Sequence, residues 1–418
     1  MTEIDSIAQK IASEGGRLYL VGGAVRDKWM GRVATDEDYC VTGLTAQEFE
    51  RLFPESFLAG MAFAVFRMPV GDSMAEFALA RTERKVSRGH TGFEVFSSPE
   101  VTIEQDLLRR DLTINAMAID VLSQTTLDPY GGLADIEQQV VRAVSRAFSE
   151  DPLRVYRAAR FAAQLGFEIE ANTLQMMRDL KGELETLSAE RVFGELKRAL
   201  GTKRPSLFFR WLLRAGVLPV HFAEIAALAG VEQPTKWHPE GDAFEHTMQV
   251  LDAAAALTSR EEVRFSALVH DVGKALTPRN KWPAHHGHES AGVPLVRKLC
   301  ERLKLPSQWT QAALFATEQH MKIHILDRMK SSKVVDLLMD ANRNPLGVEG
   351  FSMIGMADDR GRNNPRAQSP NAEALPAYWG VIQSITGKSL AIDAQGKAFG
   401  DALRKARAAA LNRWRKME

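Results

Sequence analysis

The stretch that decides the fold is YLVGGAVRDKWMGRVATDEDYCV, residues 19–41. It predicts a strand, a glycine turn, a helix and a second strand that carries acidic residues. The turn Gly22–Gly23 lets the backbone approach a bulky anion, and the amides that open the following helix attract phosphate. Arg26, one turn into that helix, is a candidate for bidentate binding of a triphosphate. The pair of glycines also fits a plain tight turn.

The second half of this stretch carries Asp36, Glu37 and Asp38. Alternate residues of a strand share a face, so Asp36 and Asp38 are expected to point the same way. Two adjacent carboxylates repel each other unless a cation lies between them, and Mg²⁺ binds one or two carboxylates together with substrate phosphates. Such ions stabilise the oxygens that attack and leave in phosphoryl transfer. An acidic, solvated turn is the alternative, and Glu76 in a later strand is a candidate third carboxylate.

Two later segments carry paired charges. In residues 109–118, Arg109 and Asp111 are candidates for binding phosphate and ribose hydroxyls, or for a salt bridge at a helix start. In residues 150–157, Pro152 suits a first helical position. The side chains of Asp151, Arg154 and Arg157 are spaced by three and fall on one side of that helix.

A carboxylate beside a guanidinium can recognise the Watson–Crick edge of a base. The carboxylate accepts from the exocyclic amine of cytosine or adenine, and the guanidinium donates to the ring acceptors. Uracil and guanine place a carbonyl at that position, so a buried pair of this kind would reject them strongly. The alternative is an ordinary surface ion pair, which contributes little.

Composition sets the broad class of the protein. The chain has 418 residues, 45% hydrophobic and 25% charged, which is typical of a soluble, multi-domain enzyme. Lys and Arg together number 53, as do Asp and Glu, so a nucleic-acid partner must be bound by local patches. Cys40 and Cys300 are the two cysteines, too few for a disulfide framework. The opening residues lack an apolar signal core and no apolar run of 18 residues occurs, so we expect a cytoplasmic protein without membrane spans.

The periodicity changes along the chain. Up to about residue 140, short apolar runs such as 18–21 and 39–41 alternate with glycine-rich turns, which predicts a small α/β domain. Residues 151–165 and 191–200 then repeat apolar positions at helical spacing. Residues 362–376, rich in proline and asparagine, are expected to form a loop or linker. Residues 404–416 carry six basic and no acidic residues, and we expect them to form a basic helix. The basic face of this helix is either solvated or in contact with phosphates.

Eight of the ten histidines lie between residues 238 and 324. The dipeptide His270–Asp271 follows an apolar helix, with His246 before it and His320 after it. Imidazole and carboxylate groups suit divalent transition metals, which can activate water against a phosphate. The pattern therefore predicts a second metal site.

The ordered motifs of the first 200 residues resemble those of the bacterial class II CCA-adding tRNA nucleotidyltransferases. The resemblance rests on residues 20–27 (LVGGAVRD), 36–38 (DED), 109–116 (RRDLTINA), 128–132 (DPYGG), 150–157 (EDPLRVYR) and 188–191 (SAER). It implies an α+β, polymerase-β-like nucleotidyltransferase head followed by all-α neck, body, HD and tail regions. Carried over residue by residue, it implies that Asp36 and Asp38 are catalytic Mg²⁺ ligands, that Gly23 and Arg26 contact the triphosphate, that Arg109 and Asp111 read the ribose, and that Asp151, Arg154 and Arg157 form the template.

Two further segments extend the resemblance. Residues 81–92 resemble the family's flexible loop, which members that add only the two cytidines shorten or lose; an ordinary basic loop is the alternative. The histidine-rich region resembles the HD phosphohydrolase domain fused to this enzyme in some gamma-proteobacteria. That domain implies 2′,3′-cyclic phosphodiesterase, 2′-nucleotidase and phosphatase activities with a transition metal such as Ni²⁺, held by His246, His270, Asp271 and His320.

One position departs from that subfamily. In that subfamily an Asp follows the histidine that corresponds to His320, whereas Met321 follows His320 in this chain. Asp358 resembles another acidic position of the domain. If the missing Asp is a ligand, hydrolysis is weakened or altered, and the polymerase prediction is unaffected.

We therefore predict four segments: a nucleotidyltransferase head (1–140), a helical neck and body (141–225), an HD domain (226–330) and a helical tail (331–418). The predicted activity is addition of C, C and A to tRNA 3′ ends from CTP and ATP, with contacts to the tRNA acceptor arm by a monomer or homodimer. An A-only adder and a poly(A) polymerase remain as alternatives. So do a metal-dependent phosphohydrolase with a vestigial head and a non-catalytic RNA-binding protein.

Overall fold

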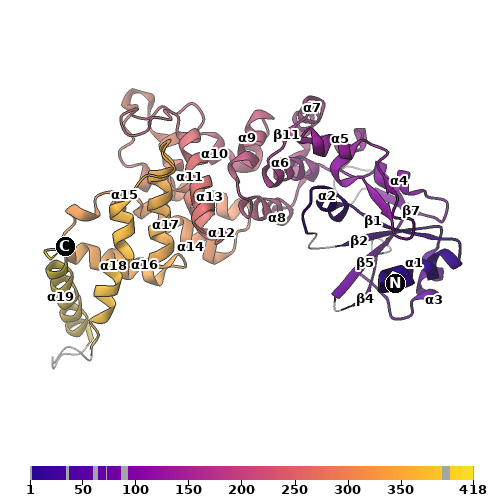
Figure 1. The fold of residues 1–418 in the computed structure, drawn as a ribbon. Helices are drawn as coiled ribbons and strands as arrows, with labels where there is room; N and C mark the ends of the chain where they lie inside the picture. Colours follow the sequence, from indigo (N-terminus) through magenta and orange to yellow (C-terminus); the bar gives the residue numbers. More distant parts are fainter. Residues whose placement is uncertain are drawn as a thin grey trace. The chain divides into compact units, whose positions relative to one another are not determined.

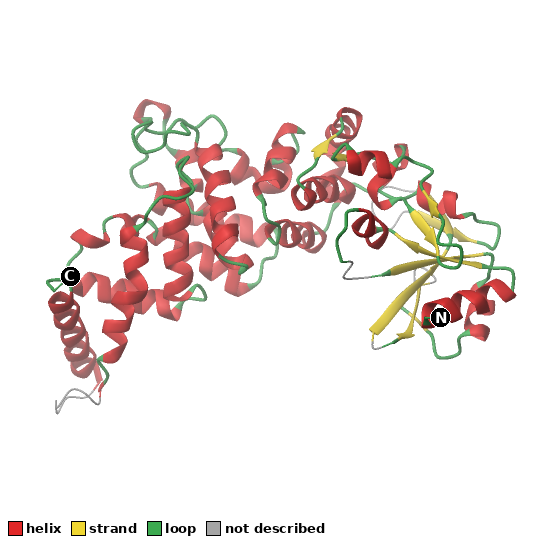
Figure 2. Cartoon of the chain, viewed as in Figure 1, coloured by secondary structure: helices red, strands yellow, loops and turns green. Residues whose placement is uncertain are grey.

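The computed structural model describes residues 2–33, 37–59, 65–71, 73–85, 93–387 and 396–417. The chain divides into two compact units, Met1–Ser188 and Ala189–Glu418. The strands lie in the first unit, and the second is built of helices (Figures 1 and 2). This confirms the predicted α+β head followed by helical regions. The division between the units falls inside the predicted segment 141–225, and the four-part division stays a prediction.

The head is built on a seven-stranded sheet in the order β3-β4-β5-β2-β1-β8-β9. Its strands are β1 (Arg17–Val21), β2 (Asp38–Thr42), β3 (Phe57–Leu58), β4 (Val65–Val70), β5 (Ser73–Leu79), β8 (Ala118–Asp120) and β9 (Thr126–Leu127). The pairs β6 (Arg81–Lys85) with β7 (Phe93–Ser97), and β10 (Val140–Val141) with β11 (Glu168–Ile169), form two small ribbons. β2 and β5 run parallel, and Asp38 at the start of β2 pairs with Val21 of β1 and Glu76 of β5. The predicted strands 18–21 and 39–41 are confirmed.

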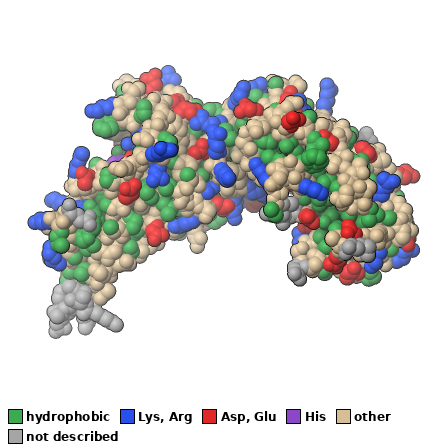
Figure 3. All heavy atoms as spheres, viewed as in Figure 1, with side chains coloured by type: hydrophobic (Ala, Val, Ile, Leu, Met, Phe, Trp, Pro, Cys, Tyr) green, Lys and Arg blue, Asp and Glu red, His purple; other side chains and the backbone are tan. Residues whose placement is uncertain are grey.

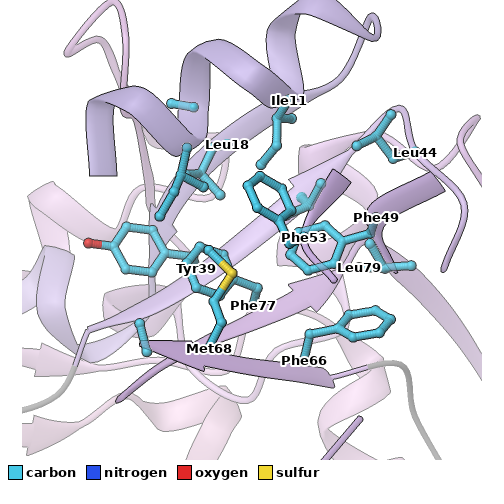
Figure 4. Packing of buried hydrophobic residues seen from close by; sticks show 14 of the residues in the cluster. Ile11, Leu18, Tyr39, Leu44, Phe49, Phe53, Phe66, Met68, Phe77 and Leu79 are labelled. Carbon is cyan, nitrogen blue, oxygen red and sulfur yellow. The ribbon is translucent and has the colours of Figure 1, made fainter. Parts of the chain in front are cut away.

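Both faces of β2 are buried. Tyr39 and Val41 pack into an aromatic cluster under the helices α1 (Glu3–Ser13) and α3 (Ala46–Leu52), shown in Figure 4. Cys40 points to the other face, into a cluster with α4 (Ile103–Leu108). Because alternate side chains of β2 are locked into two cores, the strand register is fixed and Asp38 is held at its exposed end.

Helices supply the rest of the chain. The head continues with α2 (Gly23–Trp29), α5 (Gly132–Glu137), α6 (Leu153–Leu165) and α7 (Ala171–Asp179), and with 3₁₀ turns at Thr113–Asn115, Arg146–Glu150 and Leu180–Thr186. The second unit comprises α8 (Ala189–Leu200), α9 (Ser206–Arg214), α10 (Pro219–Ala226), α11 (Ala243–Leu257), α12 (Glu261–Val269), α13 (His288–Arg302), α14 (Ser307–Gln319), α15 (Met321–His324), α16 (Ser331–Arg343), α17 (Gly347–Arg360), α18 (Pro370–Ser384) and α19 (Gly396–Trp414). Its 3₁₀ turns are η4 (Val272–Leu276), η5 (Arg279–Lys281) and η6 (Leu326–Arg328). Among the described residues, none of the helices combines the length and apolar character that crossing a bilayer requires.

The buried guanidinium of Arg264 ties several helix ends of the second unit together. It donates to the main-chain oxygens of Leu200 and Thr202 after α8, and of Ala255 and Thr258 at the end of α11. The last carbonyls of a helix have no partner within it, so one side chain here satisfies orphan acceptors of two helices. This packing holds α11 against α12, the two helices that lead into the histidine cluster.

One predicted loop is partly helical. The expectation of a loop over residues 362–376 is wrong from residue 370 onward, where α18 begins. Pro370 occupies the first turn, where a missing amide costs nothing. Pro376 leaves the carbonyl of Ala372 without its helical donor, and the Ser352 hydroxyl donates to that carbonyl at 2.7 Å. Tertiary packing thus supplies the hydrogen bond that the prolines remove.

We expect Phe49→Ala to destabilise the head by about 3–5 kcal/mol, because it empties a fully buried ring position. Phe49 lies 4.7 Å from Phe66 and 4.9 Å from Phe53 between ring centroids. Urea unfolding followed by head-specific fluorescence measures the loss. Phe96→Ala, at a ring that is 62% exposed, is the matched control and should change the unfolding free energy by less than about 1 kcal/mol. Equal losses in the two variants would contradict the proposed core.

Candidate functional site

The glycine turn of the head lies beside an acidic side chain and a basic one. Gly22 adopts φ 73° between β1 and α2, a conformation that favours glycine. A Cβ at Gly22 would lie 3.1 Å from Nη1 of Arg110 and 4.0 Å from Oδ2 of Asp38. The missing side chain therefore keeps open the space between this carboxylate and this guanidinium.

The predicted Mg²⁺ ligands are only partly described. Asp36 lies outside the described residues, so its position beside Asp38 stays a prediction. Glu76, the candidate third carboxylate, is the register partner of Asp38 on β5 and accepts from Nε of Arg67 at 2.8 Å. Carboxylate oxygens at this edge fit the ligand chemistry of Mg²⁺.

Arg26 is buried behind the glycine turn and stabilises it. Its side chain is 4% exposed. Nη1 donates to Oδ1 of Asn115 at 2.7 Å, and Nε and Nη2 donate to Oδ1 of Asp27 at 3.0 and 2.9 Å. These bonds fix the start of α2 against residues 113–115, next to Gly23.

Asp106 is a residue that sequence reasoning missed. Its carboxylate is 1% exposed and accepts from Nη2 of Arg109 at 2.8 Å and from Nη2 of Arg110 at 3.1 Å. Burial raises the pKa of Asp106, but the two guanidinium groups outweigh it and hold the pKa below its ordinary value. The spacing of three and four residues from Asp106 to the arginine pair was the available signal. Asp106 holds both arginines, and Arg110 lies beside the turn.

The ribose motif and the predicted template helix meet in an ion pair. Nε of Arg157 on α6 donates to Oδ2 of Asp111 at 2.6 Å. Burial raises the pKa of Asp111, but Arg157, together with Arg154 and Asn115, outweighs burial and lowers this pKa below its ordinary value. Arg154 donates to the main-chain oxygens of Arg109 and Ala147 at 2.7 and 2.8 Å. The structure therefore brings together the two segments that were predicted to bind one nucleotide.

Asp151 stands at the start of the same helix. Its Oδ1 accepts from the Leu153 amide at 3.0 Å. Pro152 was predicted at the first helical position, but α6 begins one residue later, at Leu153. Asp151 thus accepts from the first amide of the helix whose first two turns carry Arg154 and Arg157.

All four predicted HD-site residues lie together in the second unit, and all are buried. The histidines share one orientation. Nδ1 of His246 lies 2.8 Å from Oε1 of Glu240 and 3.2 Å from the Gly361 oxygen. Nδ1 of His270 lies 2.7 Å from the Ala267 oxygen, and Nδ1 of His320 lies 3.0 Å from the Thr317 oxygen. Each ring that donates its Nδ1–H in this way presents the lone pair of Nε2, the arrangement found at metal-bound histidines.

Asp271 lies where these lone pairs converge. Its Oδ2 is 3.3 Å from Nε2 of His270 and 3.6 Å from Nε2 of His246, and its Oδ1 is 3.4 Å from Nε2 of His320. Within the described part of the chain, Nε2 of His246, Nε2 of His270 and Oδ1 of Asp271 are buried, and their close polar neighbours are other members of this cluster. A bound cation would stabilise buried acceptors that face one another, and imidazole with carboxylate is ligand chemistry that fits a transition metal.

A second carboxylate joins the cluster from α17. Oδ1 of Asp358 lies 3.1 Å from Nε2 of His246, and Oδ2 lies 2.6 Å from Nε2 of His324. Burial raises the pKa of Asp358, while Arg362 and His324 outweigh it and keep the pKa well below its ordinary value. Met321 is 41% exposed and lies outside this set. Asp358 therefore supplies a carboxylate to a cluster that has no Asp after His320.

Lys274 and a cavity complete the surroundings. Nζ of Lys274 lies 2.5 Å from Oδ2 of Asp271 and donates to Oε1 of Gln233 at 2.6 Å. Burial raises the pKa of Asp271, and His270 and Lys274 hold it well below its ordinary value. A cavity of about 650 Å³ reaches the cluster; its lining includes Trp237, Lys274, His288, Arg328, Asp358 and Arg362. A phosphoester of nucleotide size fits this volume and these basic side chains.

Three domain families match this chain. Residues 18–142 match the poly A polymerase head domain, residues 166–228 match the probable RNA and SrmB-binding site of polymerase A, and residues 243–343 match the HD domain. The chain thus combines a nucleotidyltransferase head, an RNA-binding segment and an HD domain. The predicted resemblance is confirmed in this domain content, and the head family is a family of enzymes.

Solved structures with the same fold cover nearly the whole chain. The Bacillus stearothermophilus CCA-adding enzyme in complex with CTP is 22% identical with a TM-score of 0.63, and the match covers 98% of this chain and 92% of that one. A CCA-adding enzyme with ATP is 20% identical with a TM-score of 0.65, over 98% and 90%. A tRNA-processing enzyme in its apo form is 21% identical with a TM-score of 0.62, over 97% and 96%.

Gly273→Ala should disrupt the histidine cluster. A Cβ at Gly273 would lie 2.0 Å from the His288 oxygen and 2.6 Å from the Gly292 nitrogen, so η4 would have to move away from α13. We expect at least about tenfold weaker Ni²⁺ binding by calorimetry, the size of effect seen when the surroundings of metal ligands are disturbed. Gly380→Ala, a helical position with nothing within 4 Å, is the control and should leave the affinity unchanged. Unchanged affinity in Gly273→Ala would contradict the described packing.

Proposed function

We propose that the enzyme adds C, C and A to the 3′ end of tRNA, using CTP and ATP without a nucleic-acid template. The observation that carries the proposal is the ion pair between Asp111 and Arg157, which joins the ribose motif to the predicted template helix within the head. The combination of a poly A polymerase head with an RNA-binding segment supports the same activity. Similar folds are described with CTP and with ATP, which agrees with these two substrates.

In the proposed reaction, the 3′ hydroxyl oxygen of the RNA bonds to the α-phosphorus as the bond to pyrophosphate breaks. Asp36 and Asp38 would hold Mg²⁺, which when bound stabilises the negative charge of the triphosphate. Gly22 and Gly23 leave room for that triphosphate beside the start of α2, and Arg110 offers it a guanidinium. Arg26 acts in this scheme by fixing the turn, through Asn115 and Asp27.

Base selection would rest on α6. Asp151 would accept from the exocyclic amine of cytosine or adenine, while Arg154 and Arg157 donate to the ring acceptors. Arg157 is held by Asp111 and Arg154 by the main chain at Arg109, so a nucleotide that contacts the ribose motif would also be aligned for reading. Asp111 and Arg109 are the proposed ribose contacts.

For the second unit we propose a metal-dependent phosphohydrolase that acts as a 2′,3′-cyclic phosphodiesterase, 2′-nucleotidase and phosphatase. The converging lone pairs of His246, His270 and His320 around Asp271 support it. A transition metal such as Ni²⁺ would supply Lewis-acid activation of water there. Lys274 orients Asp271 and adds a positive charge at the cavity that would receive the phosphate.

The proposed macromolecular partner is the tRNA acceptor arm. Basic and acidic side chains are interspersed over the visible surface, so contacts to phosphates would be local (Figure 3). Such binding should weaken as salt rises, because each phosphate contact releases counterions. We propose a cytoplasmic protein that works as a monomer or homodimer.

Two alternatives of the same class and one of another class remain. An A-only adder or a poly(A) polymerase would share the head, and a phosphohydrolase with a vestigial head would share the second unit. Incorporation on three tRNAs that end before the first C, before the second C and before the A separates these activities in one gel. The CCA proposal requires incorporation on all three.

The two activities should be separable by single substitutions. Asp38→Ala should reduce labelled CTP and ATP incorporation by more than about 10²-fold, because a proposed ligand of the triphosphate's ion is lost, and should leave hydrolysis intact. Asp271→Ala should abolish hydrolysis of 2′,3′-cyclic nucleotides and leave incorporation intact. Each variant serves as the control for the other. Full nucleotide incorporation by Asp38→Ala would contradict the proposed role of Asp38 in the head.

Asp151→Asn tests base reading. Asn keeps an oxygen for the Leu153 amide and adds an N–H that can donate to the carbonyl of uracil. We expect the preference for CTP over UTP, as a ratio of kcat/KM, to fall at least about tenfold. Asp340→Asn, at an exposed ion pair of the second unit, should keep the wild-type ratio. Unchanged selectivity in Asp151→Asn would remove this residue from the template.

A further inference from the structure

We propose that a second cavity beside the histidine cluster is a nucleobase pocket, with the indole of Trp237 as its stacking surface. The inference rests on the metal-dependent phosphohydrolase proposed for the second unit. It adds the residue that would recognise the organic part of the substrate. The ligand class is a nucleoside phosphate, with the phosphate near Asp271 and the base against Trp237.

Two cavities of the second unit meet at Trp237. The main cavity, of about 650 Å³, reaches Asp271 in the cluster. The side cavity, of about 420 Å³, has none of the proposed metal ligands in its described lining. Trp237, His324 and Arg362 line both cavities. Both volumes are typical of small-molecule sites, so a ligand held at the cluster has room to extend past these side chains into the side cavity.

The loop that carries Trp237 is anchored to the cluster. The Trp237 amide donates to the Pro234 oxygen at 3.0 Å, and Oε1 of Glu240 lies 2.8 Å from Nδ1 of His246. Nζ of Lys236 lies 4.9 Å from the centroid of the Trp237 ring. The residue is nevertheless 60% exposed, which leaves ring surface for a ligand. Every base has a flat π-face, so an exposed indole beside a phosphate site suits stacking.

Consecutive carboxylates of α17 serve the two cavities. Asp358 lines the main cavity and Asp359 lines the side cavity. Nε2 of His324 lies 2.6 Å from Oδ2 of Asp358, and Nδ1 of the same ring lies 3.6 Å from Oδ1 of Asp359. Nη2 of Arg362 lies 3.2 Å from Oδ1 of Asp358, and Nη1 lies 3.5 Å from Oδ1 of Asp359. His324 and Arg362 therefore fix the wall over which the ribose would pass.

The side cavity offers the hydrogen-bonding groups that a base edge needs. The amides of Asn364, Gln368 and Asn371 line it together with Asp359. An amide both donates and accepts, and a carboxylate accepts from an exocyclic amine. The negative charge of Asp359 also disfavours a second phosphate in this cavity. An uncharged, planar base fits this lining.

The kinetic test compares two esters on the Ni²⁺-loaded chain. Both 2′-AMP and glycerol 2-phosphate are phosphate esters of a secondary alcohol, and only 2′-AMP carries a base. Trp237→Ala should lower kcat/KM for 2′-AMP by about 5- to 150-fold, the range that loss of a stacked aromatic ring causes. It should leave kcat/KM for glycerol 2-phosphate unchanged. An equal loss for both esters, or no loss for either, would overturn the base pocket.

Two further variants guard against a misfolded Trp237→Ala. Trp29→Ala, at a tryptophan of the head that is 52% exposed, is the matched control and should leave both values unchanged. Ala367 lines only the side cavity, so Ala367→Phe should fill that space and lower kcat/KM for 2′-AMP alone. Full activity of Ala367→Phe on 2′-AMP would show that the base does not enter the side cavity.

A binding measurement needs no hydrolysis. The seven tryptophans are labelled as 5-fluorotryptophan, and the fluorine signal that is missing in Trp237→Phe belongs to Trp237. Adenosine should shift that signal and ribose should not, whereas a signal unmoved at the solubility limit of adenosine would overturn the proposal. A chain that binds adenosine at Trp237 and hydrolyses neither ester would refute the proposed hydrolase and leave the base pocket standing.

Discussion

The carboxylate of Asp271 is the constraint on which the second unit depends. A buried carboxylate among imidazole nitrogens is tolerated only if the charges balance, and Lys274 supplies one positive charge at 2.5 Å. The surrounding main chain fixes which nitrogen each histidine turns toward it, through the oxygens of Ala267, His285 and Thr317. The cluster is thus preorganised for cations by the ends of its own helices.

Glycines set how closely the elements of both units can approach. Gly273 lets η4 rest directly on α13, which brings Asp271 to His288. Gly22 does the same in the head, where it leaves space between Asp38 and Arg110. A Cβ at Gly273 would meet the main chain of α13, and a Cβ at Gly22 would fill the space beside Arg110. The functional groups come from loops and helix ends, and the cores behind them keep those ends in place.

The sequence predicted most of the head because its signals are local. The strand of residues 39–41 and its acidic flank follow from alternation, and the grouping of His246, His270, Asp271 and His320 follows from the HD dipeptide and its neighbours. Asp106 was missed although its partners Arg109 and Arg110 lie only three and four residues further along the chain. Asp358 was noted by resemblance alone, because its contacts with His246 and His324 depend on tertiary packing. The same holds for residues 370–376, where the Ser352 hydroxyl replaces a lost helical donor. Asp36, a central residue of the prediction, lies outside the described residues.

The account's central claim is that the carboxylates of both units are cation ligands. The most direct measurement is an anomalous difference map at the manganese edge, from crystals grown with Mn²⁺ and CTP. The account predicts peaks beside Asp38 and beside Asp271. A map in which these carboxylates contact only protein and water would contradict it.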